Sequence, residues 1–455
     1  MLETISIFLR QGVALAWGAP LLVLVLGGGL YLMVLSRGLP LLHMTEAWRL
    51  LLRTSDKSGT GQLSHFQALS TALASTIGLG NIAGVAIAIT QGGPGAIFWM
   101  WISATLGMII KFFSCSLAVM YRTKDKHGEV LGGPMYTIEI GLGHSYRWLA
   151  IFFSAFGLMG LLGSFNANQM ATVLYETTSV PKWSTGICFV LITASVIIGG
   201  IKRIGRVASV LVPAMCLLYL GLALAVLCLH IEKVPSIFAM IFHDAFCGSS
   251  AIGGFSGAGV AFVIQTGVKR AAFSNEAGIG TAPMAHAQAK TNDPISEGLV
   301  AMIGPSLDTL FVCTLTAFVI LSSGIWTEGQ GVEGITLTLR AVENSLGLFG
   351  VIVLLMVASL FSITTMIGTS YYGKKCSVYL FGEASTPYYY AFYLGMLMVG
   401  ALWTVDSIVN LNDIAYALMV YPNMTATLIL APRVMKIFRE HRAKNLRTRS
   451  HRDTL

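Results

Sequence analysis

The chain has 455 residues, of which 55% are hydrophobic and only 11% are charged, and its mean hydropathy is +0.73. A soluble domain carries roughly 25% charged residues, and a larger core does not absorb this apolar excess, so the composition predicts an all-α polytopic membrane protein. The net charge of +8 is no nucleic-acid signature, because Lys and Arg gather in short loops and in the tail 433–452.

A helix needs about 20 apolar residues to cross a bilayer. Apolar runs bounded by charged residues predict about 11 transmembrane helices. In chain order they are 14–36, 63–91, 95–121, 147–176, 183–200, 205–230, one that starts near 250 and is broken near 274–281, 296–323, 346–372, 387–404 and 411–434.

Two of these predicted helices are interrupted by polar and glycine residues. The second carries Ser70–Gly84, with the interruption at Gly78–Asn81, and the seventh carries Phe273–Pro283. Lipid tolerates non-helical backbone only where protein or a water-filled cavity covers it, and paired interruptions in two halves of a chain indicate the binding site of a secondary transporter. Small residues such as these also line helix-packing faces, which is the alternative for part of the first segment.

Basic residues alternate between successive loops. Loops 37–62, 122–146 and 201–206, residues 374–375 and the tail are basic, whereas 177–182, 231–249, 324–345 and 405–410 are poor in Lys and Arg or acidic. This pattern predicts a multi-pass protein of the cell (inner or plasma) membrane, with the N-terminus outside and the C-terminus in the cytoplasm. Lys269 and Arg270 do not fit it: they face a wet cavity, or their helix leaves the membrane earlier.

Eleven helices divide into one extra helix and two repeats of five. Because each repeat crosses the membrane an odd number of times, the second repeat has the opposite orientation to the first. The predicted parts are an extra N-terminal helix (1–36), a first five-helix repeat (37–232), an inverted second repeat (233–436) and a basic cytoplasmic tail (437–455). The two interrupted helices are then the equivalent first helices of the two repeats.

Four strings resemble the alanine/glycine:cation symporter family, the sodium:alanine symporters. They are GNIAGVAIAITQGGPGAIFWMW (80–101), GGIKRIGRV (199–207), FSNEAGIGTAPMAHAQAKTNDPISEGL (273–299) and SYYGKKC (370–376). The similarity extends from about residue 20 to 435. It implies a LeuT-type fold with one extra N-terminal helix and sodium-coupled import of a small neutral amino acid, such as alanine, glycine or a somewhat larger one.

The implied partners are the amino acid, sodium as coupling ion and the lipid bilayer, with no other cofactor, no nucleic acid and no obligate protein partner. Coupling to protons or another cation is the alternative. An ion channel is disfavoured because no repeated filter motif is present. An enzyme is disfavoured because the chain has no GxSxG, HExxH or GxxxxGK[ST] string, and the seven cysteines have no zinc-site spacing.

The string GLGN at 78–81 is also similar to the broken first core helix of neurotransmitter:sodium symporters. That similarity implies sodium ligands at the carbonyls of Ala74 and Ile77. The inverted-repeat scheme adds the hydroxyls of Thr364 and Thr365, although a Thr in a membrane helix also bonds its own i−4 carbonyl. Thr76 and Asn81 are candidates for a second sodium.

The expected substrate-binding residues lie in the two interruptions and in the fourth and ninth helices. They are Ser75, Gly78, Leu79, Gly80, Asn168, Phe273, Ser274, Asn275, Gly278, Ile279 and Thr369. Asn166, Asn168 and Gln169 either make packing hydrogen bonds or line a cavity. Glu276 holds the broken helix, pairs with Lys269 or Arg270, or binds the substrate ammonium. Asp308 forms an ion pair with a basic residue or takes part in proton or sodium coupling, and we favour the ion pair.

Three positions depart from the usual family pattern. Many members have Thr at Leu79, Glu at Ser114 and Trp at Thr369. The loss of a hydroxyl at 79 and of a bulky ring at 369 suggests a substrate larger than alanine.

Overall fold

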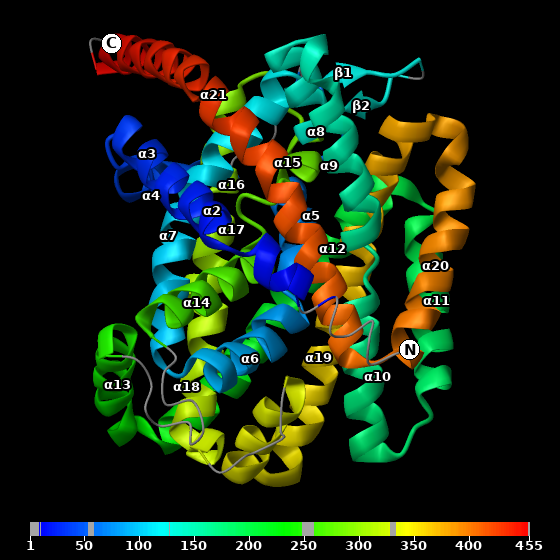
Figure 1. Cartoon of the computed structure of the whole chain (residues 1–455). Coiled ribbons are helices and arrows are strands. Elements are labelled where there is room, and N and C mark those ends of the chain that lie inside the picture. Colours follow the sequence, from blue (N-terminus) through cyan, green and yellow to red (C-terminus); the bar gives the residue numbers. More distant parts are fainter. Residues whose placement is uncertain are drawn as a thin grey trace.

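The computed structural model describes residues 9, 11–52, 59–126, 128–247, 259–327 and 334–453, with backbone alone at 405–406 and 443–453. Almost all of this is helix (Figure 1), which confirms the predicted all-α class. In the described part of the chain the single sheet is a two-stranded antiparallel hairpin, β1 (Thr123–Lys124) with β2 (Val130–Leu131).

The helices, with η marking 3₁₀ or π turns, are α2 (Ala19–Leu22), η1 (Val23–Gly27), α3 (Gly28–Leu35), α4 (Leu39–Leu51), α5 (His65–Thr76), η2 (Leu79–Asn81), α6 (Ala83–Gly92), α7 (Gly95–Met120), α8 (Pro134–Tyr136), η3 (Thr137–Leu142), η4 (His144–Tyr146), α9 (Arg147–Gly160), α10 (Ser164–Thr178), α11 (Lys182–Ile197), α12 (Gly200–Leu229), η5 (Ile231–Lys233), α13 (Val234–Cys247), α14 (Val260–Asn275), α15 (Ala282–His286), α16 (Pro294–Ala301), α17 (Ile303–Pro305), η6 (Ser306–Cys313), α18 (Thr314–Ser323), η7 (Ile325–Thr327), α19 (Ile335–Phe381), η8 (Glu383–Ser385), α20 (Thr386–Leu402) and α21 (Val405–Asp453).

Within the described residues, six helical segments are long and apolar enough to cross a membrane. The number becomes eight if two bent pairs are each counted as one span: Ala19–Leu35 with Leu39–Leu51, bent by 76°, and His65–Thr76 with Leu79–Gly92, bent by 60°. The predicted spans at 183–200 and 387–404 correspond to α11 and α20, which have 16 and 17 residues, and the predicted seventh span contains the 16-residue α14. The chain is therefore a multi-pass membrane protein.

Both predicted interruptions are present. Helix α5 ends at Thr76, the backbone is extended at Ile77 and Gly78, and α6 starts at Ala83 after the turn η2. Helix α14 ends at Asn275 and α15 starts at Ala282, and Glu276 between them adopts a left-handed φ of 54°. The two interruptions lie together, because η2 contacts both α14 and η6.

A third interruption was not expected from the sequence. The predicted span 147–176 is present within the candidate membrane span His144–Thr178, but it is interrupted, because α9 stops at Gly160 and α10 starts at Ser164. Gly163 has φ 65°, and a Cβ added there would lie 2.5 Å from the hydroxyl of Tyr393, so only glycine fits.

Several segments expected to be loops contain structure. Helix α4 occupies half of 37–62, α13 occupies most of 231–249, and the hairpin β1–β2 lies in 122–146. Arg53 and Lys57 of the first segment, and the predicted start of the seventh helix near 250, lie outside the described residues.

One end of the bundle is held closed by contacts between the two broken spans. The chain before α5 pairs with the chain after α15, since the N–H of Leu63 donates to the carbonyl of Gln288 at 3.0 Å and the N–H of Lys290 to that of Leu63 at 2.7 Å. Next to this pairing, the buried carboxylate of Glu297 accepts hydrogen bonds from His65 and, at 2.5 Å, from His286.

His286 is therefore bonded to Glu297. The described residues contain no group of three or more His, Cys, Asp and Glu side chains that could hold a metal ion.

We expect Gly61→Ala to weaken this closed end. Gly61 has φ 135°, and a Cβ there would lie 2.2 Å from the carbonyl oxygen of Ala289, so the pairing would have to shift. A strained non-glycine residue costs about 1–3 kcal/mol, which a lower thermal unfolding midpoint of the detergent-purified protein would report. Gly221→Ala is the matched control, because a Cβ at Gly221 meets nothing within 4 Å. Equal midpoints for the two variants would contradict the expectation.

Candidate functional site

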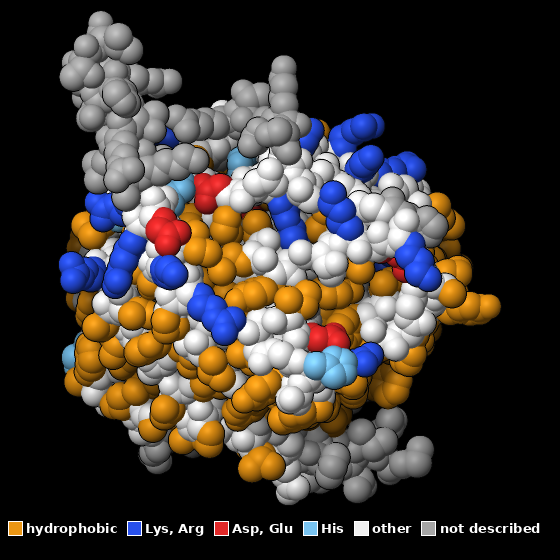
Figure 2. All heavy atoms as spheres, turned by 90° about the horizontal axis from the view of Figure 1, so that it is seen from above, with side chains coloured by type: hydrophobic (Ala, Val, Ile, Leu, Met, Phe, Trp, Pro, Cys, Tyr) orange, Lys and Arg blue, Asp and Glu red, His pale blue; other side chains and the backbone are white. Residues whose placement is uncertain are grey.

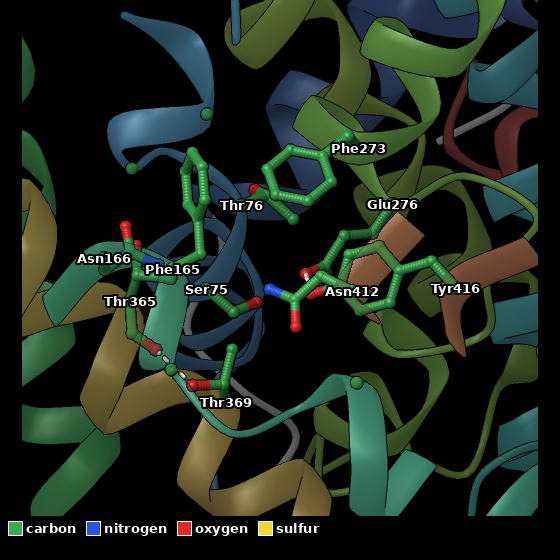
Figure 3. Close-up of a pocket in the computed structure, with 14 residues that line it drawn as sticks. Ser75, Thr76, Phe165, Asn166, Phe273, Glu276, Thr365, Thr369, Asn412 and Tyr416 are labelled. Atoms are coloured by element: carbon green, nitrogen blue, oxygen red, sulfur yellow. Dashed lines mark hydrogen bonds between the residues drawn. The ribbon is translucent and has the colours of Figure 1, made fainter. Parts of the chain in front are cut away.

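A small cavity lies between the interrupted helices (Figure 3); its empty space, counted together with the solvent at its mouth, is about 360 Å³. Its walls come from α5, η2, α9, α10, α14, α19 and α21. The lining residues are Ser75, Thr76, Gly78, Gly80, Gly160, Gly163, Phe165, Asn166, Phe273, Glu276, Thr365, Thr369, Asn412 and Tyr416. Residues nearly 340 positions apart in the sequence thus share one small space.

Of the expected substrate-binding residues, five line this cavity: Ser75, Gly78, Gly80, Phe273 and Thr369. The other six do not: Leu79, Asn168, Ser274, Asn275, Gly278 and Ile279. Asn166, for which packing and cavity lining were both open, does line it.

The residues outside the cavity have structural partners. The amide of Asn168 donates to the carbonyls of Gly400 at 3.0 Å and Trp403 at 2.8 Å, so it ties α10 to α20. The side chains of Leu79 and Ile279 are fully buried in the apolar core. The backbone N–H of Leu79, however, donates to Asn166 Oδ1 at 3.3 Å in the cavity wall.

Ser274 and Asn275 belong to a polar cluster behind the cavity, centred on Asp308. Asp308 Oδ1 accepts hydrogen bonds from Asn81 Nδ2 at 2.9 Å, from Thr309 Oγ1 at 3.0 Å and from the hydroxyl of Ser274. Asn275 Nδ2 donates to Thr309 Oγ1 at 3.0 Å. The expected ion pair of Asp308 is therefore wrong for the described residues: its bonded partners are neutral donors, and Asp308 Oδ2 is buried without a partner.

The two threonines expected to bind sodium differ in whether their hydroxyl groups already have hydrogen-bond partners. Thr365 Oγ1 is buried without a hydrogen-bond partner and lies beside Gly78, where a Cβ would be only 2.2 Å away. Thr364 Oγ1 instead donates to the carbonyls of Leu360 at 2.9 Å and Phe361 at 3.0 Å, the common arrangement of Thr in a membrane helix.

The end of α5 leaves oxygen atoms without helical partners. In a continuing helix the N–H of Gly78 would bond the carbonyl of Ala74, but it donates to Asn81 Oδ1 at 3.0 Å instead. The backbone turns away from the helix at Ile77, with ψ 93°. Thr76 Oγ1, on the last helical residue, is also buried without a partner.

An aromatic wall closes one side of the cavity. The ring of Phe273 packs edge-on against Phe165 at 5.1 Å and tilted against Tyr416 at 5.5 Å between centroids. The guanidinium of Arg270 lies 5.7 Å from the Phe273 ring on the next turn of α14.

Lys269 and Arg270 neither line this cavity nor mark an early exit from the bundle. Arg270 Nη2 bonds Asp413 Oδ2 at 2.7 Å and Lys269 Nζ lies 3.2 Å from the same atom, with the side chains of Arg270 and Asp413 both 1% exposed. Asp413, on α21, is thus a second buried carboxylate that the sequence analysis overlooked.

Glu276 is the one charged side chain that lines the cavity. It accepts hydrogen bonds from the hydroxyl of Thr281 and, at 3.5 Å, from that of Tyr416, and it forms no ion pair with a Lys or Arg among the described residues. Of the three roles considered for Glu276, pairing with Lys269 or Arg270 is therefore excluded, because both basic residues pair with Asp413.

Sequence reasoning missed Asn412 and Tyr416 on α21, and Gly160, Gly163 and Phe165 at the third interruption. Asn412 and Asp413 form a polar pair inside the apolar run 411–434, and this pair is the signal that could have found the α21 wall. Asn412 and Tyr416 are one helical turn apart and therefore share a face.

The model of the sodium:alanine symporter family matches residues 2–454. The sodium/alanine symporter AgcS of Methanococcus maripaludis is 39% identical, covering 94% of this chain and 97% of its own. The probable sodium/glutamine symporter GlnT of Bacillus subtilis is 34% identical, covering 94% and 88%. The crystal structure of MhsT in complex with L-phenylalanine has a TM-score of 0.61 at 13% identity over 82% of this chain and 90% of that one, which shows a shared fold.

These similarities span almost the whole chain and agree with the LeuT-type fold expected from its motifs. They make it a membrane transporter rather than an enzyme. The chain belongs to the sodium:alanine symporter family.

Proposed function

We propose that the protein is a sodium-coupled symporter that imports a small neutral amino acid by alternating access. The observation that carries the proposal is the buried cavity at the interrupted helices, where the Thr365 hydroxyl is unpaired and Glu276 is the single charged lining group. Neutral oxygens suit a hard cation, and a zwitterion suits a site with both freed N–H groups and acceptors.

The cavity has a polarity that would orient the substrate. In the turn η2 the N–H of Leu79 is bonded to Asn166 Oδ1, so the N–H of Gly80 would be the donor for the substrate carboxylate, which the first turn of a helix favours. Glu276 lies in the wall supplied by α14 and α21 and would bind the ammonium group. The coupling sodium would be held by the carbonyls of Ala74 and Ile77, with Thr365 and a reoriented Thr364.

A second cation would bind behind the cavity. Thr76 and Asn81 were its candidates, and both belong to the interruption that contacts Asp308. A buried carboxylate oxygen without a partner is costly unless a cation or a proton joins it, so Asp308 Oδ2 supports this site. The same atom also supports the second candidate function, in which a proton rather than sodium is the coupling ion.

We further propose the eleven-helix organisation, with an extra helix (1–36), repeats 37–232 and 233–436, and a tail 437–455. The two interrupted helices that share the cavity would then be the first helices of inverted repeats. Figure 2 views the end that carries the C-terminal part of α21, and Lys and Arg side chains are more numerous there than Asp and Glu. This supports a cytoplasmic C-terminus and an external N-terminus.

Purified protein in liposomes should accumulate labelled neutral amino acid when an inward sodium gradient is imposed. Collapse of the gradient should abolish accumulation, because no other energy source is present. Uptake driven by a proton gradient without sodium would favour the second candidate function. The absence of uptake for every neutral amino acid would refute both.

We expect Thr365→Val to raise the sodium concentration for half-maximal uptake about ten-fold or more, because the variant loses one oxygen ligand but keeps its shape. The measurement is initial uptake rate against sodium concentration. Thr427→Val is the matched control, since its hydroxyl bonds the carbonyl of Asn423 at 2.8 Å away from the cavity. An unchanged sodium requirement in Thr365→Val would remove this residue from the sodium site.

Asp308→Asn should make uptake depend less steeply on sodium while leaving the protein folded. The amide keeps an acceptor for Asn81 but removes the charge that would hold the second cation. The Hill coefficient for sodium, measured at saturating substrate, should fall toward one. A Hill coefficient equal to that of the unmodified protein would argue that Asp308 has only a structural role.

A further inference from the structure

Asn412 lines the cavity, and the oxygen of its side-chain amide takes part in no hydrogen bond. It extends from α21 into the middle of the cavity (Figure 3) and is 4% exposed. Asn412 Oδ1 is buried without a hydrogen-bond partner. The neighbouring Asp413 forms an ion pair with Arg270. Of the two polar residues on α21, Asp413 therefore has a structural partner, whereas the side-chain oxygen of Asn412 has none.

Three other polar side chains that line the cavity already have hydrogen-bond partners. Thr369 Oγ1 donates to the carbonyl of Thr365 at 2.8 Å and lies 3.0 Å from the hydroxyl of Tyr393. Ser75 Oγ donates to the carbonyl of Ala72 at 2.8 Å. The amide of Asn166 accepts from the N–H of Leu79. An uncompensated buried amide is costly, and a ligand that pairs with it removes that cost.

The substrate ammonium is not the best partner for this amide. Glu276 lines the same cavity, and a carboxyl group is a stronger acceptor for an ammonium group than a neutral amide is. If the ammonium binds Glu276 and the carboxylate binds at η2, the group that remains to meet Asn412 is the substrate side chain.

An aliphatic side chain such as the methyl group of alanine would leave the Asn412 amide unpaired. A carboxamide carries both a donor and an acceptor, as the asparagine amide does, so the two can pair reciprocally in either orientation of the Asn412 group. Gly160, Gly163 and Thr369 line the same cavity as Asn412.

This proposal rests on the proposed symport function. We propose that Asn412 hydrogen-bonds the substrate side chain and thereby selects a neutral amino acid whose side chain ends in a carboxamide, asparagine or glutamine. A site with a polar group positioned for such a side chain rejects an apolar isostere far more strongly than an apolar pocket rejects a polar one. Asn412 is then a specificity-determining residue.

The unmodified protein provides the first test. Asparagine and leucine have side chains of the same branching, so their competition against labelled alanine uptake isolates the amide. We expect asparagine or glutamine to compete at a concentration at least about ten-fold lower than leucine, from the cost of an unpaired buried amide. Equal competition, or preference for leucine, would overturn the proposal while sodium-driven alanine uptake would still support the symport function.

The second test uses Asn412→Leu and the ratio of half-inhibitory concentrations for leucine and asparagine. We expect this ratio to fall about ten-fold or more, because the amide partner is replaced by an apolar group of equal shape. If Asn412 instead contacts the ammonium, all amino acids lose affinity together, the ratio stays constant and the proposal fails. Asn410→Leu, on the same helix but outside the cavity, is the matched control and should keep the original ratio.

A misfolded Asn412→Leu is recognised by its thermal unfolding midpoint. In that case Asn412→Ser, which keeps a polar group but shortens it, serves as the variant. Its leucine-to-asparagine ratio should also fall, and an unchanged ratio would contradict the proposal. A failure of all sodium-driven uptake in the unmodified protein would refute the symport function rather than the assignment of Asn412.

Discussion

A membrane interior contains no water to bond free backbone groups, so every interruption of a helix needs side chains that replace the missing bonds. In this protein asparagine amides do so at both interruptions. Asn81 and Asn166 accept from the N–H groups of Gly78 and Leu79. Asn275 accepts from the N–H of Ala277, and Asn423 donates to the carbonyl of Gly278. The cavity depends on these four bonds, because without them the helices could not remain broken beside one another.

The groups that this compensation leaves unpaired are the ones that give the cavity its chemistry. The hydroxyls of Thr76 and Thr365, one oxygen of Asp308 and one of Asn412 are buried without partners. In a water-free interior each is costly alone, so each favours an ion or a substrate atom that completes it. Phe165, Phe273 and Tyr416 form an apolar wall of the cavity that contains these groups.

Two charged clusters lie on either side of the seventh-span interruption along the chain. Arg270, before it, is paired with Asp413, and His286, after it, is bonded to Glu297 together with His65. The second cluster adjoins the backbone pairing of Leu63 with residues 288–290, so that end is closed by hydrogen bonds as well as by packing. A transporter that opens alternately must break one set of such contacts at a time, which explains why they are concentrated outside the cavity rather than in it.

Composition and hydropathy sufficed for the all-α membrane class, because apolar length and charge are properties of the chain alone. The glycine and asparagine strings located both predicted interruptions, since a helix must stop where its residues favour other backbone conformations. The interruption at Leu161–Gly163 escaped notice because glycines there also fit a packing face. The partner of Arg270, the neutral donors around Asp308 and the free amide of Asn412 were decided only by the tertiary structure. Hydrogen bonds and ion pairs act over about 3 Å, and α21 brings Asp413 to Arg270 of α14 from 143 residues away, so no local pattern could reveal which groups remain unpaired.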